Sequence, residues 1–260
     1  MNSIDLNCDM GEMPAAIADG TQETLMAFVT SVNIACGGHA GDEATMRTTV
    51  EQALRKKVAV GAHPGYADRA NFGRLELALS PDALAQTVFE QVSKLAEIAA
   101  KCGARISHVK AHGALYNQAA RDTAIAAAVA NGVARWRRDV ILVGLAGSPT
   151  LEVFREAGLG AAGEAFADRR YDPDGTLRSR NFADALILDP AEAAAQALRI
   201  AENGSVIAAG GDEIRVEAQT ICVHGDSPGA VKIAAAVAQC LSDAGIALRP
   251  LAPGSQARHR

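Results

Sequence analysis

The sequence predicts one α/β domain whose parallel sheet closes into a barrel. Short apolar segments with strand character alternate with amphipathic helix patterns about seven times, which is typical of a parallel sheet covered by helices. The length of 260 residues is close to the roughly 250 residues of a typical β/α barrel. Polar residues follow at least five of the strands, whereas a doubly wound sheet gathers functional residues at one switch point.

Capping residues define the expected elements of the first half of the chain. Thr21 and Asp42 are N-cap residues for two helices, and Ser80 followed by Pro81 marks the start of a third. The third helix carries one apolar stripe, formed by Leu84, Val88, Val92, Leu95 and Ala99. The expected strands are 3–8, 31–36, 58–61 and 106–110, and the expected helices are 22–28, 42–57 and 81–101.

The second half repeats the pattern. Asp189 followed by Pro190 begins one helix, and Pro228 begins the last one. A long polar loop is expected at residues 168–180, and a hairpin is expected to join 205–208 to 214–216. The other expected elements are strands 140–145, 161–166 and 220–223, and helices 123–135, after Pro149, 190–203 and 228–243. We predict a single barrel domain over residues 1–252 and a frayed tail at 253–260.

The composition excludes several classes of protein. The net charge is −5 and the basic residues are scattered, so no nucleic-acid partner is expected. The N-terminus lacks a signal-peptide pattern and no run of 18 apolar residues exists, so no membrane partner is expected. Five Cys without a C-x-x-C pair indicate a reducing compartment, and we predict a cytoplasmic protein. Most of these thiols are expected to be buried, with a catalytic thiol at Cys8 or Cys36 as the alternative.

Ionisable residues gather where strands end. The first strand delivers Asp5, Asn7, Asp9 and Glu12 within eight residues, which packing alone does not explain. Four His also fall just past predicted strands, while a fifth, His108, lies inside one. A single such His is most simply a buried structural imidazole, but four at equivalent strand ends predict one shared site. These four are His39, His63, His112 and His224.

Lys110 and His112 are two positions apart at the end of the fourth strand. They share one face if both are extended, which places Lys110 among inward-pointing groups. A buried Lys requires an anion beside it, and Asp5, Asp9, Glu12 or a substrate anion would serve. The alternative is a Lys110–Asp pair that only stabilises the barrel.

Two glycine-containing turns lead from strands into helices. Gly37 and Gly38 precede one helix N-terminus, where backbone N–H groups bind carboxylates or phosphates. His224 and Asp226 lie in the second turn, although Asp226 is equally suited to cap a helix. Arg74 and Arg169 lie on loops expected over the same face, and Arg suits binding of a carboxylate.

Several catalytic motifs are missing from the chain. There is no G-x-x-x-x-G-K-[ST], no G-x-G-x-x-G after the first strand, no G-x-S-x-G and no H-E-x-x-H. The sequence therefore argues against a P-loop NTPase, a dinucleotide-dependent dehydrogenase and a serine hydrolase of the nucleophile-elbow type.

In the segments that contain the strand-end residues described above, the sequence resembles the LamB/YcsF family, the A subunits of the prokaryotic ATP-dependent 5-oxoprolinases. The matching segments span nearly the whole chain in order. They are 5–12 (DLNCDMGE), 33–42 (NIACGGHAGD), 61–66 (GAHPGY), 72–74 (FGR), 109–117 (VKAHGALYN), 164–171 (EAFADRRY) and 221–226 (ICVHGD). The resemblance implies an irregular seven-stranded β/α (TIM-like) barrel of the glycoside hydrolase/deacetylase type.

The resemblance also implies an activity, namely opening of 5-oxo-L-proline to L-glutamate with ATP as co-substrate and with partner subunits B and C. We expect Asp9, Glu12 or His112 to act as general base and Lys110 to face developing negative charge. The expected substrate-binding residues are Asn7, Gly37, Gly38, His39, His63, Arg74, Asn117, Arg169, His224 and Asp226.

Three positions depart from the family pattern, and two other functions remain open. Gly38 replaces a usual Phe, which would enlarge the pocket, Ala111 replaces a usual Pro, and Leu75 replaces a common second Arg. The kinship with deacetylases suggests a metal-dependent deacetylase as an alternative. Its divalent metal would have Asp9, His63 and His112 as candidate ligands. A non-catalytic scaffold subunit is the third hypothesis.

Overall fold

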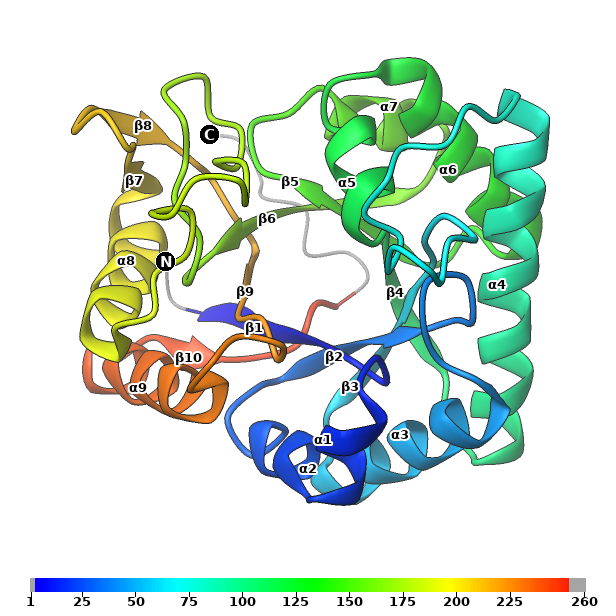
Figure 1. The fold of residues 1–260 in the computed structure, drawn as a ribbon, viewed down its shortest axis with the longest axis horizontal. Helices are drawn as coiled ribbons and strands as arrows, with labels where there is room; N and C mark the ends of the chain where they lie inside the picture. The colour runs from blue at the N-terminus through cyan, green and yellow to red at the C-terminus, as the bar shows by residue number, and fades with distance from the viewer. Residues whose placement is uncertain (1–2, 253–260) are drawn as a thin grey trace.

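Seven parallel strands close into a barrel in the computed structural model, which describes residues 3–252. The predicted fold class is therefore confirmed (Figure 1). The ring closes because β9 pairs with both β6 and β1. In spatial order the ring contains β1 (Ser3–Met10), β2 (Ser31–Ala35), β3 (Ala59–His63), β4 (Ile106–Lys110), β5 (Ile141–Leu145), β6 (Gly160–Phe166) and β9 (Thr220–Cys222). The predicted tail at 253–260 lies outside the described residues.

Helices surround this ring. Figure 1 shows α8 and α9 on the left, α1 to α3 below, α4 on the right and α5 to α7 above. They are α1 (Pro14–Ala18), α2 (Thr21–Leu25), α3 (Glu43–Lys56), α4 (Pro81–Lys101), α5 (Gly113–Ala119), α6 (Thr123–Trp136), α7 (Thr150–Glu156), α8 (Pro190–Asn203) and α9 (Ala230–Asp243). Among the described residues, no helix combines the length and the apolar character needed to cross a membrane.

Most predicted capping interactions are present. Asp42, Ser80 and Asp189 each accept a hydrogen bond from a backbone N–H in the first turn of α3, α4 and α8. The prediction for Thr21 is wrong, because the N-cap of α2 is Gly20, whose positive φ of 81° suits glycine. Thr21 is instead the first helical residue, and α2 ends at Leu25 rather than at residue 28.

Three short elements were not predicted. They are α1, α5 and β10 (Ala247–Leu248), which extends the sheet beside the start of β1. Segments of two to seven residues are too short to show a hydrophobic period, so the sequence pattern does not predict these elements. The predicted hairpin is confirmed as β7 (Ser205–Ile207) paired with β8 (Glu213–Arg215).

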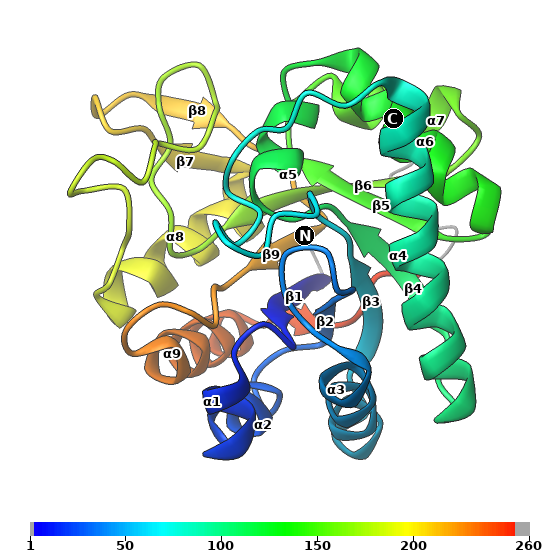
Figure 2. The ribbon, with the colours of Figure 1, turned by 45° about the vertical axis from the view of Figure 1, so that its right-hand side comes forward.

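The interior of the barrel is polar beside β1 and apolar beside β5 and β6, where Ile141, Val143, Ala162 and Leu251 form a small cluster. Along β1, alternate residues point to opposite sides of the sheet. Ile4, Leu6 and Cys8 belong to the hydrophobic core, whereas the side chains of Asp5 and Asn7 are buried among polar groups of other strands. Because all seven strands of the ring are parallel, their carboxyl ends meet at one face (Figure 2).

Candidate active site

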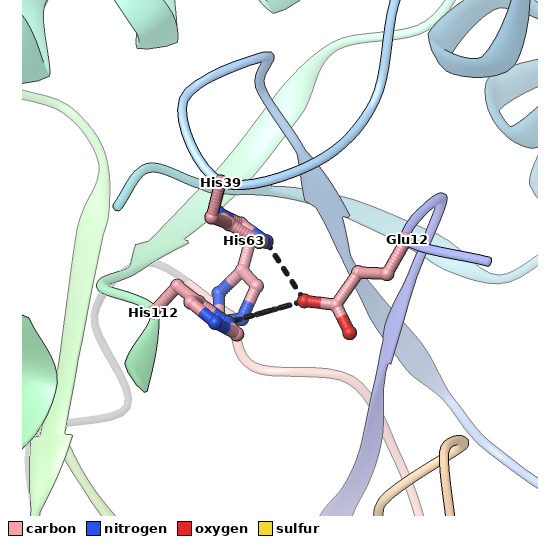
Figure 3. Close-up of side chains that lie close together, drawn as sticks. All are labelled: Glu12, His39, His63 and His112. Carbon is pink, nitrogen blue, oxygen red and sulfur yellow. Dashed lines mark hydrogen bonds and ion pairs between the residues drawn. The ribbon is translucent and has the colours of Figure 1, made fainter. Parts of the chain in front are cut away.

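Four residues from four successive strand ends converge at this face. Glu12 follows β1, His39 follows β2, His63 ends β3 and His112 follows β4. Figure 3 shows the three imidazoles grouped opposite the Glu12 carboxylate. Glu12 Oε1 lies 2.8 Å from His39 Nε2, 3.1 Å from His112 Nδ1 and 3.7 Å from His63 Nε2. The structure thus brings together four residues that the sequence placed in one site.

The far sides of two imidazoles are fixed by backbone carbonyl groups. His63 Nδ1 lies 2.8 Å from the carbonyl oxygen of Lys110, and His112 Nε2 lies 2.9 Å from that of Phe72. Carbonyl oxygens only accept, so both of these ring nitrogens carry hydrogen. The remaining nitrogens, His63 Nε2 and His112 Nδ1, face each other at 3.0 Å.

Glycines allow these rings to pack closely. A Cβ atom at Gly73 would lie 2.7 Å from His39 Cβ, and one at Gly65 would lie 2.9 Å from His39 Nδ1. The rings of His39 and His112 stack with centroids 3.6 Å apart and an interplanar angle of 4°. The two glycines therefore belong to the architecture of the site.

The electrostatics of this cluster favour an ionised carboxylate. Burial alone would raise the pKa of Glu12, but hydrogen bonds to His112 and His39 outweigh it and hold the pKa well below its usual range. Burial lowers the pKa of His39 to about 4, so this imidazole is neutral at pH 7. The pKa of His63 is raised, because Asp9 and Glu12 together outweigh its burial.

Asp9 connects the His cluster to Lys110. Asp9 Oδ1 accepts from Lys110 Nζ at 3.0 Å and from Asn33 Nδ2 at 2.8 Å, while Oδ2 lies 3.3 Å from His63 Nε2. Burial would raise the pKa of Asp9, but the charges of His63 and Lys110 hold it well below its usual range. Asp9 was among the predicted anions for Lys110.

Lys110 has a second anion that the sequence did not suggest. Its Nζ lies 2.9 Å from Glu164 Oε1, and the Glu164 side chain is fully buried on β6. Burial would lower the pKa of Lys110, but Asp9 and Glu164 raise it well above its usual value. Lys110 is therefore a buried ammonium between two carboxylates.

Asn7 and its neighbours form a hydrogen-bonded network beneath the site. Asn7 Nδ2 donates to Glu164 Oε1 at 2.9 Å and to Thr220 Oγ1, and Asn7 Oδ1 accepts from Asn33 at 2.8 Å. Asn33 donates its two amide hydrogens to Asn7 and Asp9. Its remaining polar atom, Oδ1, accepts a hydrogen bond from His108 Nε2 at 2.8 Å. Asn7 thus supports Lys110 and Asp9 from below.

His224 and Asp168 form a second ionisable group on the other side of Asp9. Asp168 accepts from the backbone N–H of His224 at 2.8 Å and from Nδ1 at 2.9 Å. Burial would raise the pKa of Asp168, but the charge and hydrogen bonds of His224 lower it. A ring nitrogen of His224, the Asp9 carboxylate and Cys222 Sγ all lie within 4.8 Å of one another.

A pocket opens beside these groups. Its empty volume is about 290 Å³, and Asp9 and Glu12 belong to its lining. Further lining residues come from the end of β1, from the loops after β1 and β9 and from the first two helices; they are Met10, Met13, Ala16, Gln22, Leu25, Gly225 and Asp226. A small partly apolar molecule in this pocket would contact both carboxylates.

Arginines lie at the rim. Arg74 and Arg180 both approach Asp226 Oδ2, at 2.8 Å and 3.5 Å. The buried guanidinium of Arg169 donates instead to the carbonyl groups of Ala185 and Arg178.

The remaining predicted residues contact other parts of the loops. Asn117 is exposed on α5. The N–H of Gly37 donates to Ala40 within its own loop. At Gly38 a Cβ atom would lie 2.4 Å from Gln91 Oε1, so Gln91 of α4 fills the space that we expected to enlarge the pocket. Gln91 in turn hydrogen-bonds both the N–H and the carbonyl of Gly65.

The thiols fit a structural role. Cys8 and Cys36 are buried, and burial raises the pKa of the Cys36 thiol to about 12. A thiol at such a pKa is not a nucleophile at pH 7.

Glu164, Asp168 and Asn33 were missed as site residues. Each had a weak signal, since Asn33 and Glu164 are polar residues inside apolar strands and Asp168 follows β6 by two positions. Their partners lie far away in the chain, and sequence spacing alone does not reveal such pairs.

The chain matches the LamB/YcsF family over residues 4–256. A protein of Chloroflexus aggregans, named as the A subunit of 5-oxoprolinase, is 51% identical over 249 residues, which cover 96% of this chain and 99% of the relative. A relative of the same name from Bordetella pertussis is 47% identical over 247 residues, covering 95% and 98%.

Two solved structures share the architecture. A lactam utilization protein from Thermus thermophilus aligns with a TM-score of 0.88 at 40% identity, covering 95% of this chain and 99% of that one. The catalytic domain of a peptidoglycan N-acetylglucosamine deacetylase from Eubacterium rectale aligns with a TM-score of 0.52 at 10% identity, covering 100% and 92%. At this identity the second likeness concerns the fold alone.

Proposed function

Because the chain belongs to the LamB/YcsF family, we propose that it is one subunit of an ATP-dependent 5-oxoprolinase. In this proposal its barrel opens the lactam ring of 5-oxo-L-proline to give L-glutamate. The names of the relatives and of the Thermus protein support the substrate class. The naming of the relatives as A subunits supports an assembly with further subunits, which we propose to be B and C.

The observation that carries the proposal is the placement of ionisable groups around one pocket. Asp9 and Glu12 line the pocket, and behind them lie Lys110, three imidazoles and the His224–Asp168 pair. Opening a cyclic amide requires a base for water, a cation or donor for the oxyanion and an acid for the leaving nitrogen. The site offers a group for each of these tasks.

ATP would serve as co-substrate because the lactam is a resonance-stabilised amide that water attacks poorly. Transfer of a phosphoryl group to the amide oxygen makes the ring carbon electrophilic and converts that oxygen into a leaving group. Water oxygen then bonds to this carbon, the ring C–N bond breaks and the nitrogen takes up a proton, which gives an acyl phosphate of glutamate. A second water molecule then bonds to the same carbon and displaces inorganic phosphate, which leaves L-glutamate. We propose that the partner subunits B and C perform or complete the activation by ATP.

Asp9 is the general base that the geometry favours. Its Oδ1 is held by Lys110 and Asn33, whereas its Oδ2 contacts only His63 Nε2, at 3.3 Å, among the ion pairs of this carboxylate. Asp9 also lines the pocket, where Oδ2 would accept the proton of a water molecule. Lys110, 3.0 Å from Asp9, provides positive charge near the oxyanion.

The His224–Asp168 pair relays a proton to the leaving nitrogen, because His224 Nε2 can accept a proton from solvent and pass it on. Asp168 holds hydrogen on His224 Nδ1, which directs the basic Nε2 away from the pair. At the rim, Arg74 and Arg180 share a single carboxylate, Asp226. The excess positive charge there suits the carboxylate of 5-oxoproline.

Reconstitution tests this function. The chain is mixed with the candidate B and C subunits of the same organism, and L-glutamate release from 5-oxo-L-proline and ATP is measured. The proposal predicts release only in the complete mixture, with neither the chain alone nor B and C alone forming glutamate. Glutamate formation by B and C without this chain would contradict it.

A further inference from the structure

We infer that Glu12, His63 and His112 form a binding site for one divalent transition-metal ion of the zinc type. The inference does not depend on the identity of the substrate. It rests on the direction of three donor atoms, on the distances between them and on the groups that hold them from outside.

The ring nitrogens that face inward carry lone pairs. In the neutral rings the hydrogens sit on His63 Nδ1 and His112 Nε2, because both of these nitrogens face backbone carbonyl oxygens. His63 Nε2 and His112 Nδ1 therefore present lone pairs to each other at 3.0 Å, and Glu12 Oε1 adds a third acceptor 3.1 Å from His112 Nδ1. Three converging acceptors repel one another unless a proton or a metal ion lies among them.

The distances suit a single ion. Ligands bound at about 2.0–2.1 Å in a tetrahedral arrangement are about 3.3 Å apart. The three donor atoms here are separated by 3.0, 3.1 and 3.7 Å. Two imidazoles and a Glu carboxylate are a donor set of catalytic zinc sites with an open position.

The outer contacts are those of a metal site. Ligating His residues normally donate their second ring N–H to a carbonyl or carboxylate, as His63 and His112 do here. His39 Nε2 lies 2.8 Å from Glu12 Oε1 and orients the carboxylate by donating to it. The His39 ring stacks on the His112 ring with centroids 3.6 Å apart. An ion bound by His112 would lie in the plane of that ring and outside the plane of His39, so we count His39 as an outer contact and not as a ligand.

Asp9 lies beside this site rather than in it. One of its oxygens is taken by Lys110 and Asn33, and the other is 3.3 Å from His63 Nε2. Glu12 also lines the pocket, so the open position of the ion would face it. When bound, such an ion polarises a carbonyl oxygen or a water molecule.

The test is a metal titration of the full-length chain after treatment with a chelator. Zn²⁺ alone is added in a calorimeter, without lactam, nucleotide or partner subunits, and one ion per chain is expected to bind. In parallel, Co²⁺ added in place of Zn²⁺ should give the strong visible absorption that is typical of this ion when it has four or five ligands. The Co²⁺ measurement needs no variant, and both readouts are independent of activity.

Variants locate the ion. His63→Gln, His112→Gln and Glu12→Gln should each weaken Zn²⁺ binding by more than roughly 100-fold, and His39→Gln by roughly 10- to 100-fold. His224→Gln is the matched control and should bind Zn²⁺ as the parent does. Circular dichroism verifies that each variant is folded.

Two results would overturn the inference. The first is an unaltered parent chain that binds neither Zn²⁺ nor Co²⁺, in which case a proton on His63 relieves the repulsion. The second is loss of binding in His224→Gln with retention in the other variants, which would move the ion to Asp9, Cys222 and His224. Either result leaves the lactam proposal to its own assay, which measures glutamate.

Discussion

Asp168 accepts two hydrogen bonds from His224, one from the backbone N–H and one from Nδ1. The second bond fixes the tautomer of the His224 ring. The pKa of Asp168 is lowered in the fold, since the charge and hydrogen bonds of His224 outweigh burial. The folded pKa lies below the unfolded value of about 3.9. The Asp168 carboxylate therefore adds stability above about pH 4, and this contribution is lost as the pH falls through the folded pKa.

The corresponding variant is Asp168→Asn. We expect its deficit in free energy of unfolding, relative to the parent, to be full at pH 6 and to shrink as the pH is lowered below about 4. Urea unfolding at a series of pH values measures this difference. A deficit that stays constant over the whole range would show that the charge of Asp168 is irrelevant.

Lys110 is a second residue for which the structure predicts whether a substitution raises or lowers stability. Lys110→Met leaves the buried carboxylates of Asp9 and Glu164 without their cation, which should cost roughly 3–5 kcal/mol of stability. The double variant Lys110→Met/Glu164→Gln should recover part of this loss, because it removes one unpaired charge. Equal stability of the single and double variants, measured by urea unfolding, would refute the pairing with Glu164.

Residue-scale prediction from the sequence was limited by distance along the chain. Asp9 was predicted as one anion for Lys110 because both lie at strand ends. Glu164 was not predicted, since its bond to Asn7 joins positions 157 residues apart. Asp168 was missed for the same reason, because the pairing of β6 with β9 brings the loops after these two strands together.

At the scale of elements, the contact between β3 and β4 depends on a glycine. A Cβ atom at Gly61 would lie 2.1 Å from His108 Nε2, and His108 holds the amide of Asn33. Gly61→Ala should therefore destabilise the barrel by roughly 1–3 kcal/mol through overpacking. Thermal unfolding monitored by circular dichroism provides the measurement.

Gly160→Ala is the matched control for Gly61→Ala, because Gly160 also lies in a barrel strand. A Cβ atom there would meet its nearest neighbour at 3.5 Å, an ordinary contact. We expect the control to lose clearly less stability than Gly61→Ala. Equal losses in the two variants would mean that the His108 ring moves aside without cost.

The elements themselves were largely predictable. Cap residues such as Asp42 and Asp189 and the stripe on α4 carry local physical signals, and the structure confirms them. The prediction that Thr21 caps a helix was wrong because the N-cap of α2 is Gly20, which has a positive φ and provides no side-chain hydrogen bond. The short helices α1 and α5 have no apolar period of their own, and isolated helices of this length are marginal in water.

For the whole molecule, closure of the ring explains why residues from both ends of the chain share one site. Asp9 from the first strand lies between His63 on one side and the neighbourhood of His224 and Cys222 on the other. The even spread of polar strand ends predicted this closure, because parallel strands of a barrel end at one face. The separation into two ionisable groups on either side of Asp9 emerged only from the structure.

The proposed function depends most on Asp9 acting as base in ring opening. The most direct measurement is the rate of L-glutamate formation by the chain reconstituted with its B and C subunits, comparing Asp9→Asn with Asp212→Asn. Asp212 is exposed in the turn between β7 and β8, outside the ring, so its substitution is a matched control. We expect a loss of roughly 100-fold or more for Asp9→Asn and an unchanged rate for the control. A folded Asp9→Asn chain that forms glutamate at the control rate would contradict the assignment of Asp9 as the base.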